Sequence, residues 1–316
     1  MIQIRINVIK QKGEMIMKKI ALLLVMVLTL SLVGCGGSSE PAEDAVAFEG
    51  KYIVSADYVK ENLDNIVVVD ARGEDAAKKG TVKGAIATTW QYLATCEDGA
   101  AGDANWGCIL DVERLSERLG GLGLAKDAEI VIFSNAEEGW GEDGRIAWEL
   151  IAAGYENVKL VDGGIKALKA ADVEMEKGAA TPVPVEVTVE AIDETHVINT
   201  DELKSIYSEC KVVDVRDDKE YDGKAAYGEA KGGHLPGAIH IKYTDLFNSD
   251  STLKSNEELT AMFEEAGLTT EDHIVTYCTA GIRSAYMQLV MEMCGFENSE
   301  NYDESFYRWC AVEGVE

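Results

Sequence analysis

Residues 68–72 read Val-Val-Asp-Ala-Arg, and residues 212–216 read Val-Val-Asp-Val-Arg. Farther along the chain, Gly-Tyr-Glu-Asn at 154–157 is matched by Gly-Phe-Glu-Asn at 295–298. The chain therefore contains one duplication, and the second copy is three residues shorter than the first between these motifs. A duplication of this kind sets the architecture, because each copy is expected to fold in the same way.

Each copy alternates short runs of β-branched residues with segments of helical periodicity. The apolar stretches Ile66–Val69, Val212–Val215 and His273–Tyr277 are predicted strands. Ser255 stands three residues before Glu258 and predicts a capped helix start. Strands that alternate with helices favour an α/β fold, in which a mostly parallel sheet is flanked by helices. In such sheets, functional residues gather at the carboxyl ends of the strands.

The composition suits two domains of ordinary size. The chain has 316 residues, 47% of them hydrophobic, so each copy can bury its own core. Prolines and small residues between the copies predict a linker. The predicted organisation is a signal region at 1–34, a lipidated flexible tether at 35–47, a non-catalytic domain at 48–178, a linker at 179–190 and a catalytic domain at 191–316.

The N-terminal segment has the order of residues that is typical of an export signal. Two lysines precede the apolar run Ile20–Val33, which is too short to span a bilayer comfortably. Residues 32–35, Leu-Val-Gly-Cys, resemble a bacterial lipobox, whose cysteine is acylated. Residues 1–16 do not fit such a signal, so we expect translation to start at Met17. We expect the mature protein to be exported and anchored by lipid on Cys35 to the outer face of the cell membrane.

The charge and the cysteines limit the possible partners. The formal net charge is −28, which should repel nucleic acid and requires local positive charge wherever an anionic substrate binds. The seven cysteines lack the paired spacing of a zinc site, and no metal is expected. Outside the cytoplasm, Cys96 and Cys108 are predicted either to form a disulfide or to remain two buried free thiols.

Residues 274–284, Ile-Val-Thr-Tyr-Cys-Thr-Ala-Gly-Ile-Arg-Ser, place a cysteine between a predicted strand and a predicted helix. The amides of such a loop can point at the sulfur of Cys278, and the helix start adds partial positive charge. Both effects favour the thiolate, which is the nucleophilic form. Gly281 permits a tight turn, and Arg283 adds a fixed charge. The alternative is a buried structural thiol, which needs neither of these neighbours.

Four motifs, in order, resemble those of the rhodanese superfamily, and the resemblance extends from about Phe48 to the C-terminus. The motifs are Asp-Val-Arg at 214–216, Gly-His-Leu-Pro-Gly-Ala at 233–238, the cysteine loop at 278–283 and Tyr-Asp-Glu-Ser-Phe-Tyr-Arg-Trp at 302–309. The last is similar to the C-terminal signature of tandem thiosulfate and 3-mercaptopyruvate sulfurtransferases. The resemblance implies two rhodanese-like domains and a sulfurtransferase that needs no cofactor.

The length of the cysteine loop separates two chemistries known on this fold. Cys278–Arg283 has the form Cys-x4-Arg, whereas the related cysteine phosphatases use Cys-x5-Arg. The resemblance therefore implies a loop sized for one extra sulfur atom, which Cys278 takes from a small anionic donor and passes to a thiol or cyanide acceptor. The candidate binding residues beside Cys278 are Thr279, Ala280, Gly281, Ile282 and Ser284.

The resemblance also implies that Arg216 and Arg283 hold the anionic donor. For Arg216 the alternative is a structural ion pair with Glu220, one helical turn away. Arg283 favours a dianion such as thiosulfate as the donor over 3-mercaptopyruvate. His234 is expected to organise its own loop rather than to reach the sulfur.

The first copy has Ser134 where the second has Cys278, and residues 135–145 carry four acids. Acidic residues would destabilise a bound anion, so the first copy is predicted to be a non-catalytic partner domain. Two other functions stay open for the chain. One is a redox protein, in which Cys278 exchanges disulfides with Cys294 or Cys310. The other is a non-catalytic lipoprotein that carries a persulfide to a partner.

Overall fold

The computed structural model of the protein describes residues 46–316. The predicted signal region at 1–34, the start at Met17 and the lipidation site Cys35 lie outside these residues. Within 46–316, no helix is both long enough and apolar enough to cross a membrane. Both copies of the duplication lie in the described part, which forms one compact unit from Val46 to Glu316.

The first copy forms a five-stranded sheet in which all neighbouring strands are parallel. The strand order is β1-β6-β5-β2-β4. The central strand β5 is buried along its whole length, as expected for a parallel sheet that is covered on both faces. The strands are β1 (Ile53–Val54), β2 (Val67–Asp70), β4 (Ile86–Ala87), β5 (Ile130–Phe133) and β6 (Val158–Val161), with a separate antiparallel pair of β3 (Thr81–Val82) and β7 (Met175–Glu176).

The second copy repeats this topology. Its sheet is also five-stranded and parallel, with the order β10-β9-β11-β12-β8. This is the order of the first sheet read from the opposite edge, so β11 takes the place of β5. The strands are β8 (Val197–Ile198), β9 (Lys211–Asp214), β10 (Ile239–His240), β11 (Ile274–Tyr277) and β12 (Ser299–Tyr302).

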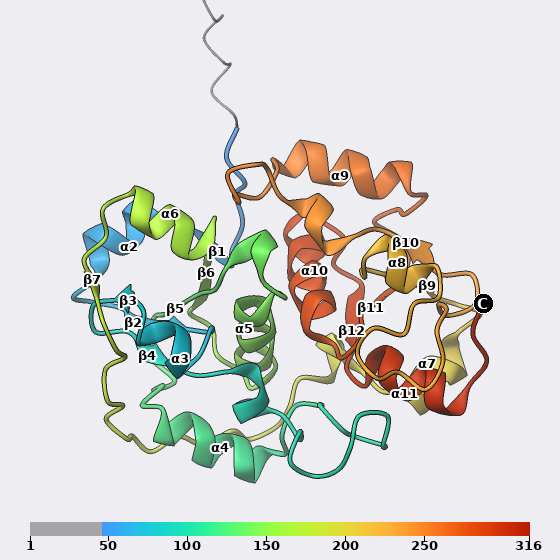
Figure 1. The fold of residues 1–316 in the computed structure, drawn as a ribbon, viewed down its shortest axis with the longest axis horizontal. Helices are drawn as coiled ribbons and strands as arrows, with labels where there is room; N and C mark the ends of the chain where they lie inside the picture. Colours follow the sequence, from blue (N-terminus) through green and yellow to red (C-terminus); the bar gives the residue numbers. More distant parts are fainter. Residues whose placement is uncertain (1–45) are drawn as a thin grey trace, which may run out of the picture. The chain divides into compact units, whose positions relative to one another are not determined.

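Helices cover both faces of each sheet (Figure 1). In the first copy they are α2 (Ala56–Asn62), α3 (Glu74–Ala77), α4 (Val112–Gly121), α5 (Glu142–Ala152) and α6 (Gly164–Ala170). In the second they are α7 (Thr200–Ile206), α8 (Asp218–Tyr221), α9 (Asn256–Glu265), α10 (Ile282–Met293) and α11 (Ser305–Val312). Four short 3-10 helices join them: η1 (Trp90–Leu93), η2 (Ala136–Glu138), η3 (Glu194–His196) and η4 (Tyr243–Leu246). The predicted fold class is confirmed.

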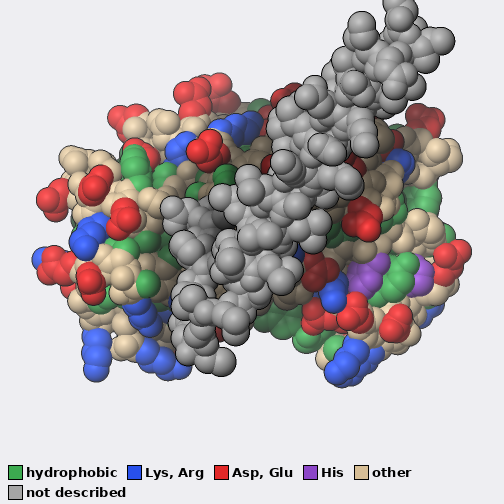
Figure 2. Space-filling view, turned by 90° about the horizontal axis from the view of Figure 1, so that it is seen from above, with side chains coloured by type: hydrophobic (Ala, Val, Ile, Leu, Met, Phe, Trp, Pro, Cys, Tyr) green, Lys and Arg blue, Asp and Glu red, His purple; other side chains and the backbone are tan. Residues whose placement is uncertain are grey.

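The surface is acidic, as the sequence requires. The chain has 57 acidic and 29 basic side chains, and in Figure 2 the acidic ones are spread over the visible face. A distributed negative charge of this kind attracts cations and repels anions at long range.

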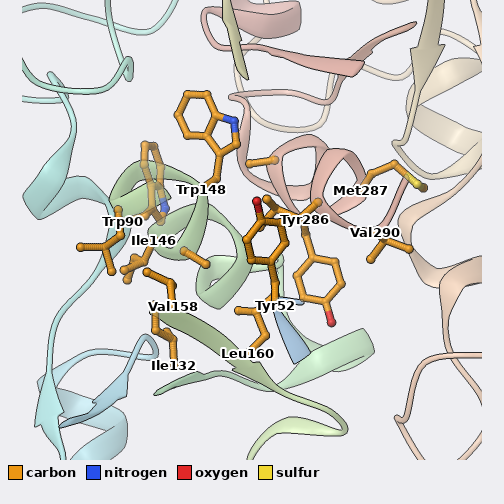
Figure 3. Close-up of a cluster of buried hydrophobic side chains, with 14 of the residues drawn as sticks. Tyr52, Trp90, Ile132, Ile146, Trp148, Val158, Leu160, Tyr286, Met287 and Val290 are labelled. Atoms are coloured by element: carbon orange, nitrogen blue, oxygen red, sulfur yellow. The ribbon is translucent and has the colours of Figure 1, made fainter. Parts of the chain in front are cut away.

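The two copies pack through α5 and α10, which lie side by side (Figure 1). Tyr286 of α10 lies against Gly144 of α5, where an added Cβ would be only 2.3 Å from the tyrosine ring. Around this contact, side chains from both copies belong to one buried hydrophobic cluster (Figure 3), and Trp148 and Met287 are among them. A shared core of this size allows residues of the first copy to reach a site in the second.

The predicted strands and helix start agree closely with the structure. The predicted strand His273–Tyr277 corresponds to β11, and Ser255 caps α9 in a reciprocal capping box with Glu258. Residues 179–190, predicted as a linker, contain neither helix nor strand. They run close against α4, because a Cβ at Gly120 would lie 2.7 Å from the Val185 carbonyl oxygen.

Candidate active site

Cys278 lies between the last residue of β11 and the first turn of α10. Because β11 is the central strand, the cysteine sits where parallel sheets place their functional residues. Gly281, the residue before α10, has a φ of +76°. A Cβ on Gly281 would lie 2.7 Å from the Asp303 carbonyl oxygen and 2.8 Å from the Arg145 guanidinium. Only glycine suits both the backbone and the space.

The sulfur of Cys278 faces the start of α10. The backbone N–H of Ile282 donates to the sulfur at 3.2 Å, and the N–H groups of Ser284 and Ala280 act in the same direction. Burial by itself raises the pKa of the Cys278 thiol, but Arg283 and these N–H groups outweigh it and hold the pKa below its ordinary value. The loop therefore favours a thiolate.

The C-terminal motif holds the cysteine loop in place. The hydroxyl of Ser305 accepts the Cys278 N–H at 2.9 Å and donates to the Cys278 carbonyl at 3.1 Å. The N–H groups of Phe306 and Tyr307 donate to the carbonyls of Cys278 and Thr279 at 3.1 and 3.0 Å. These hydrogen bonds satisfy the carbonyl groups of Cys278 and Thr279 at the start of the loop. The N–H groups after the cysteine, such as that of Ile282, can then donate to the sulfur.

Arg283, which ends the Cys-x4-Arg loop, shares its charge with Glu220. Its two terminal nitrogens donate to the two carboxylate oxygens at 2.9 and 2.8 Å, and the side chains are only 6% and 3% exposed. Thr279 donates to the same carboxylate at 2.8 Å. Burial raises the pKa of Glu220, but hydrogen bonds and charge from Arg283, aided by Thr279, bring it below its ordinary value. The loop therefore has less net positive charge than its sequence indicates.

Arg216 is bound to the aspartate two residues earlier and does not line the pocket beside Cys278. Its buried guanidinium bonds Asp214, with a nitrogen–oxygen distance of 2.6 Å, and donates to the Gly233 carbonyl at 2.8 Å. The predicted ion pair of Arg216 with Glu220 is wrong, because Glu220 is bound to Arg283. Arg216 does not line the pocket beside Cys278, and its role toward the donor stays a prediction. The strand end was predicted correctly, but the side chain turns back toward the aspartate two residues earlier. Its position does not support a donor-binding role.

Cys278 borders a pocket of about 230 Å³. The cysteine itself is only 1% exposed, so the pocket is the route by which a small molecule reaches the sulfur. Two of the predicted binding residues, Gly281 and Ser284, do not line the pocket, and Ser284 is fully buried. The residues lining the pocket are Trp90, Gln91, Trp106, Trp140, Tyr227, Cys278, Thr279, Ala280, Ile282, Arg283 and Tyr307.

Two aromatic pairs cross between the copies at this pocket. Trp140 meets Tyr227 edge to face, with ring centroids 5.0 Å apart, and Trp106 meets Tyr307 in the same way at 5.5 Å. Trp90 of η1 adds a third tryptophan from the first copy. Sequence reasoning gave none of these aromatic residues a role, since packing between distant segments assembles them. The sequence offers one signal for a role of these residues, which is the rarity of tryptophan. The chain has five tryptophans, and three of them line this pocket.

Arg145 of α5 supports the cysteine loop from the first copy. Its guanidinium donates to the Gly281 carbonyl at 3.1 Å and to the Asp303 carboxylate at 2.6 Å. It also donates to Glu149 at 2.7 Å, and all of it is buried. The geometry of the loop in the second copy therefore depends on a side chain of the first.

The equivalent site in the first copy lacks these features. Ser134 follows β5 where Cys278 follows β11, and Asp143 is the second residue of α5 where Arg283 is the second residue of α10. Burial raises the pKa of the Asp143 carboxyl to about 7. The first copy thus has the hydroxyl of Ser134 where the second copy has the thiol of Cys278. It has the carboxyl of Asp143 where the second copy has the guanidinium of Arg283.

The other cysteines between residues 46 and 316 are all free thiols. Cys96 and Cys108 are free thiols, as in the second of the two predicted possibilities, but both are half-buried rather than fully buried. Burial raises the pKa of Cys96 to about 11 and that of Cys108 still further. Among residues 46–316, no three histidine, cysteine or acidic side chains are grouped as metal ligands.

Comparison with known sequences gives a consistent result. A family model described as the rhodanese-like domain matches the chain twice, at residues 55–171 and 199–312. A protein of Mycobacterium leprae named "Putative thiosulfate sulfurtransferase" is 28% identical over 274 residues, covering 83% of this chain and 96% of that protein. The "Sulfur carrier protein TtuD" of Thermus thermophilus is 28% identical over 291 residues, covering 83% and 95%.

Solved structures share the fold. The anaerobic ergothioneine biosynthesis enzyme of Chlorobium limicola superposes with a TM-score of 0.73 at 21% identity, covering 82% of this chain and 68% of that one. A structure of wild-type EanB gives a TM-score of 0.70 at 21% identity, with 89% and 66% covered. At this identity the likeness concerns the fold alone.

Proposed function

The chain belongs to the rhodanese family of sulfurtransferases, and we propose that it transfers sulfur through a persulfide on Cys278. The observation that carries this proposal is the environment of the sulfur. The sulfur of Cys278 accepts a hydrogen bond from the Ile282 N–H at 3.2 Å, the pKa of its thiol is lowered, and the residue borders a pocket. Burial instead raises the pKa to about 11 at three other cysteines, which are Cys96, Cys210 and Cys294.

The proposed reaction is a double displacement. The Cys278 thiolate attacks the outer sulfur of thiosulfate, the sulfur–sulfur bond breaks, and sulfite leaves with the electron pair. An acceptor thiolate or cyanide then attacks the outer sulfur of the persulfide, and the Cys278 thiolate is the leaving group. The N–H groups of the loop stabilise negative charge on the transferred sulfur. Because both leaving groups are anions, neither step requires a general acid.

Thiosulfate is the first choice of donor and 3-mercaptopyruvate the second. The names of the relatives support thiosulfate. The structure supports thiosulfate less strongly than the sequence pattern did. Arg283 is paired with Glu220, and Arg216 is paired with Asp214. Donor binding therefore depends mainly on the N–H groups of the loop and on the part of the Arg283 charge that Glu220 does not cancel.

The first copy is proposed to be a non-catalytic partner domain. It has Ser134 in place of the nucleophile, but it supplies three tryptophans to the pocket and Arg145 to the loop. It should therefore influence substrate choice while carrying no sulfur itself.

A persulfide carrier is the second candidate, supported by the name of the Thermus thermophilus relative. A carrier must present its sulfur to a protein thiol, whereas Cys278 is only 1% exposed and lies beside a pocket of about 230 Å³. This favours a small acceptor. The redox alternative has less support, because burial raises the pKa of Cys294 to about 11 and Cys310 is fully buried, with its thiol donating to the Tyr307 carbonyl.

Steady-state transfer to cyanide tests the proposal. Thiosulfate and 3-mercaptopyruvate are compared as donors for the wild type, Cys278→Ser and the matched control Cys210→Ser. We expect turnover in the wild type and the control and none in Cys278→Ser. A Cys278→Ser variant that keeps its rate would overturn the assignment of the nucleophile, and a clear preference for 3-mercaptopyruvate would overturn the choice of donor.

We also propose that the protein is exported and lipid-anchored through Cys35, with translation starting at Met17. The support is the order of charged, apolar and small residues in the sequence before Cys35. Labelling of cells with a palmitate analogue should mark the wild type and leave Cys35→Ala unmarked. Equal labelling of both, or precursor peptides from residues 1–16 in mass spectrometry, would contradict this.

A further inference from the structure

The loop that corresponds to the cysteine loop in the first copy is the longer of the two. Residues 134–141 join β5 to α5, whereas residues 278–281 join β11 to α10. The longer loop carries Trp140 to the pocket beside Cys278. The first copy, which has Ser134 in place of the cysteine, thus uses this loop to shape the active site of the second copy.

Trp140 and Tyr227 lie at the mouth of that pocket. They are 40% and 45% exposed, whereas Cys278 is 1% exposed. Among residues 46–316, they are the only aromatic side chains that belong to the large, exposed hydrophobic ones. Because both also line the pocket, they lie between the solvent and the sulfur. We call this pair of residues the aromatic gate.

Contacts from both copies hold the ring of Trp140 in place. The ring of Tyr227 meets it edge to face, with centroids 5.0 Å apart and an interplanar angle of 84°. The guanidinium of Arg283 lies over it, 4.9 Å from its centroid. The backbone N–H of Trp140 donates to the Glu142 carboxylate at 2.9 Å. Edge-to-face and cation–π contacts both stabilise such an arrangement, so the ring is a fixed barrier at the mouth of the pocket.

Hydrogen bonds also fix the position of Tyr227. Its N–H donates to the Glu229 carboxylate at 2.7 Å, and its carbonyl accepts the Tyr307 hydroxyl at 2.8 Å. The N–H of Tyr307 in turn donates to the Thr279 carbonyl at 3.0 Å. Tyr227 is therefore connected through Tyr307 to the loop that holds the sulfur.

The space behind the aromatic gate is small. Its volume of about 230 Å³ lies below the roughly 300–1,000 Å³ of typical ligand pockets. Cyanide, thiosulfate and the thiol end of a small molecule fit such a space, so the gate is compatible with the proposed anionic donor. A cysteine on a folded protein brings its backbone and neighbouring side chains with it, and these would clash with the two rings.

We propose that the aromatic gate selects the sulfur acceptor by size, so that small nucleophiles collect the sulfur and protein thiols are excluded. This inference rests on the proposed function and names the residues that set its choice of acceptor. A small thiolate passes between Trp140 and Tyr227 and attacks the outer sulfur of the Cys278 persulfide. The sulfur–sulfur bond breaks, and the products are the Cys278 thiolate and the persulfide of the acceptor. A larger acceptor is rejected by a clash, which is a common source of specificity.

Discharge of the persulfide by acceptors of different size tests this proposal. Protein loaded with thiosulfate is mixed with cyanide or with reduced thioredoxin, and loss of the persulfide is followed by mass. In the double variant Trp140→Ala with Tyr227→Ala, the rate with thioredoxin relative to that with cyanide should rise at least about tenfold. Both side chains are exposed, so this variant should fold. An unchanged ratio would overturn the proposal, and a lower ratio would mean that the two rings bind a protein acceptor.

Matched variants show whether the loss of the rings is the cause. Trp140→Phe and Tyr227→Phe each keep a ring at the gate, and their ratios should stay close to that of the wild type. Tyr92→Ala removes a half-buried ring outside this pocket, and its ratio should also stay close to that of the wild type. A ratio in Tyr92→Ala as high as in the double alanine variant would contradict the role of the gate.

Alkylation of Cys278 tests the gate without a persulfide. N-ethylmaleimide and a polyethylene glycol maleimide have the same reactive ring but differ in bulk. In the wild type only N-ethylmaleimide should modify Cys278 readily, whereas both reagents should do so in the double alanine variant, as peptide mass spectrometry would show. If the wild type reacts equally fast with both, this inference fails and the proposed function stands. If no donor loads Cys278, the proposed function fails, and alkylation still decides whether the gate limits access.

Discussion

Arg283 and Glu220 form a buried, two-pronged ion pair beside Cys278, with nitrogen–oxygen distances of 2.9 and 2.8 Å. The glutamate lies in α8, which follows β9, and the arginine lies in α10, which follows the neighbouring strand β11. The pair therefore ties the cysteine loop to the adjacent strand end. It gives Arg283 two tasks, since the arginine lowers the pKa of Cys278 and also satisfies a buried carboxylate.

Variants of the pair separate these two tasks. Arg283→Met should lower the free energy of unfolding by about 3–5 kcal/mol, because it leaves Glu220 buried without its partner. The double variant Arg283→Met with Glu220→Met should recover most of that stability but little sulfur transfer, since the thiolate still lacks its cation. Denaturant unfolding and the cyanide assay measure the two effects. A double variant with wild-type activity would show that the charge of Arg283 is not needed.

Selective alkylation tests the lowered pKa of Cys278. Iodoacetamide at pH 7 should modify Cys278 first, because only the thiolate reacts and burial raises the pKa to about 11 at Cys96, Cys210 and Cys294. The rate at Cys278 should fall only at pH values below its lowered pKa, and peptide mass spectrometry identifies the modified residue. Faster modification of Cys210 or Cys294 than of Cys278 would contradict the predicted order.

A pair of glycine substitutions tests the shape of the loop. Gly281→Ala and Gly267→Ala both place an alanine at positive φ, +76° and +90°, which costs about 1–2 kcal/mol. Only at Gly281 does the new Cβ clash, at 2.7 Å from the Asp303 carbonyl, whereas nothing lies within 4 Å at Gly267. Sulfur transfer should therefore fall at least about tenfold in Gly281→Ala, equivalent to about 1.4 kcal/mol in the barrier, and stay near wild type in Gly267→Ala. If Gly281→Ala and Gly267→Ala transferred sulfur equally fast, the cysteine loop would not need its observed backbone position.

Asp143 should make stability depend on pH. Burial raises the pKa of its carboxyl from 3.8 to about 7 in the folded chain, so between these values the folded state holds a proton that the unfolded state has lost. The contribution of this group to stability therefore falls as the pH rises from about 4 to about 7. Asp143→Asn removes that loss, and its stability relative to the wild type should increase over this range and then level off. Denaturant unfolding across pH gives the difference, and a constant offset would contradict the raised pKa.

The sequence predicted the features that depend on local patterns. The strand that becomes β11, the cap of α9 at Ser255 and the cysteine loop all follow from periodicity, capping residues and a repeat, which act over a few neighbouring positions. The parallel sheets follow from the alternation of these elements. Periodicity and capping depend on residues that are close in the sequence. They predict the structure correctly here because the tertiary packing favours the same helices and strands.

The sequence could not predict which side chains meet across the fold. Arg216 was expected near the donor but bonds Asp214, while Glu220 was considered as its partner and instead bonds Arg283. Both outcomes depend on side-chain direction, which residue spacing does not determine. The sequence did not predict that tryptophans line the pocket. They belong to the first copy and come close to the cysteine only because α5 packs on α10.

The intact mass of purified protein after incubation with thiosulfate tests most directly whether the ring of N–H groups holds sulfur on Cys278. We predict a gain of one sulfur atom in the wild type, its loss on addition of cyanide, and no gain in Cys278→Ser. A wild-type protein that gains no sulfur, or a Cys278→Ser protein that gains as much, would contradict the central claim.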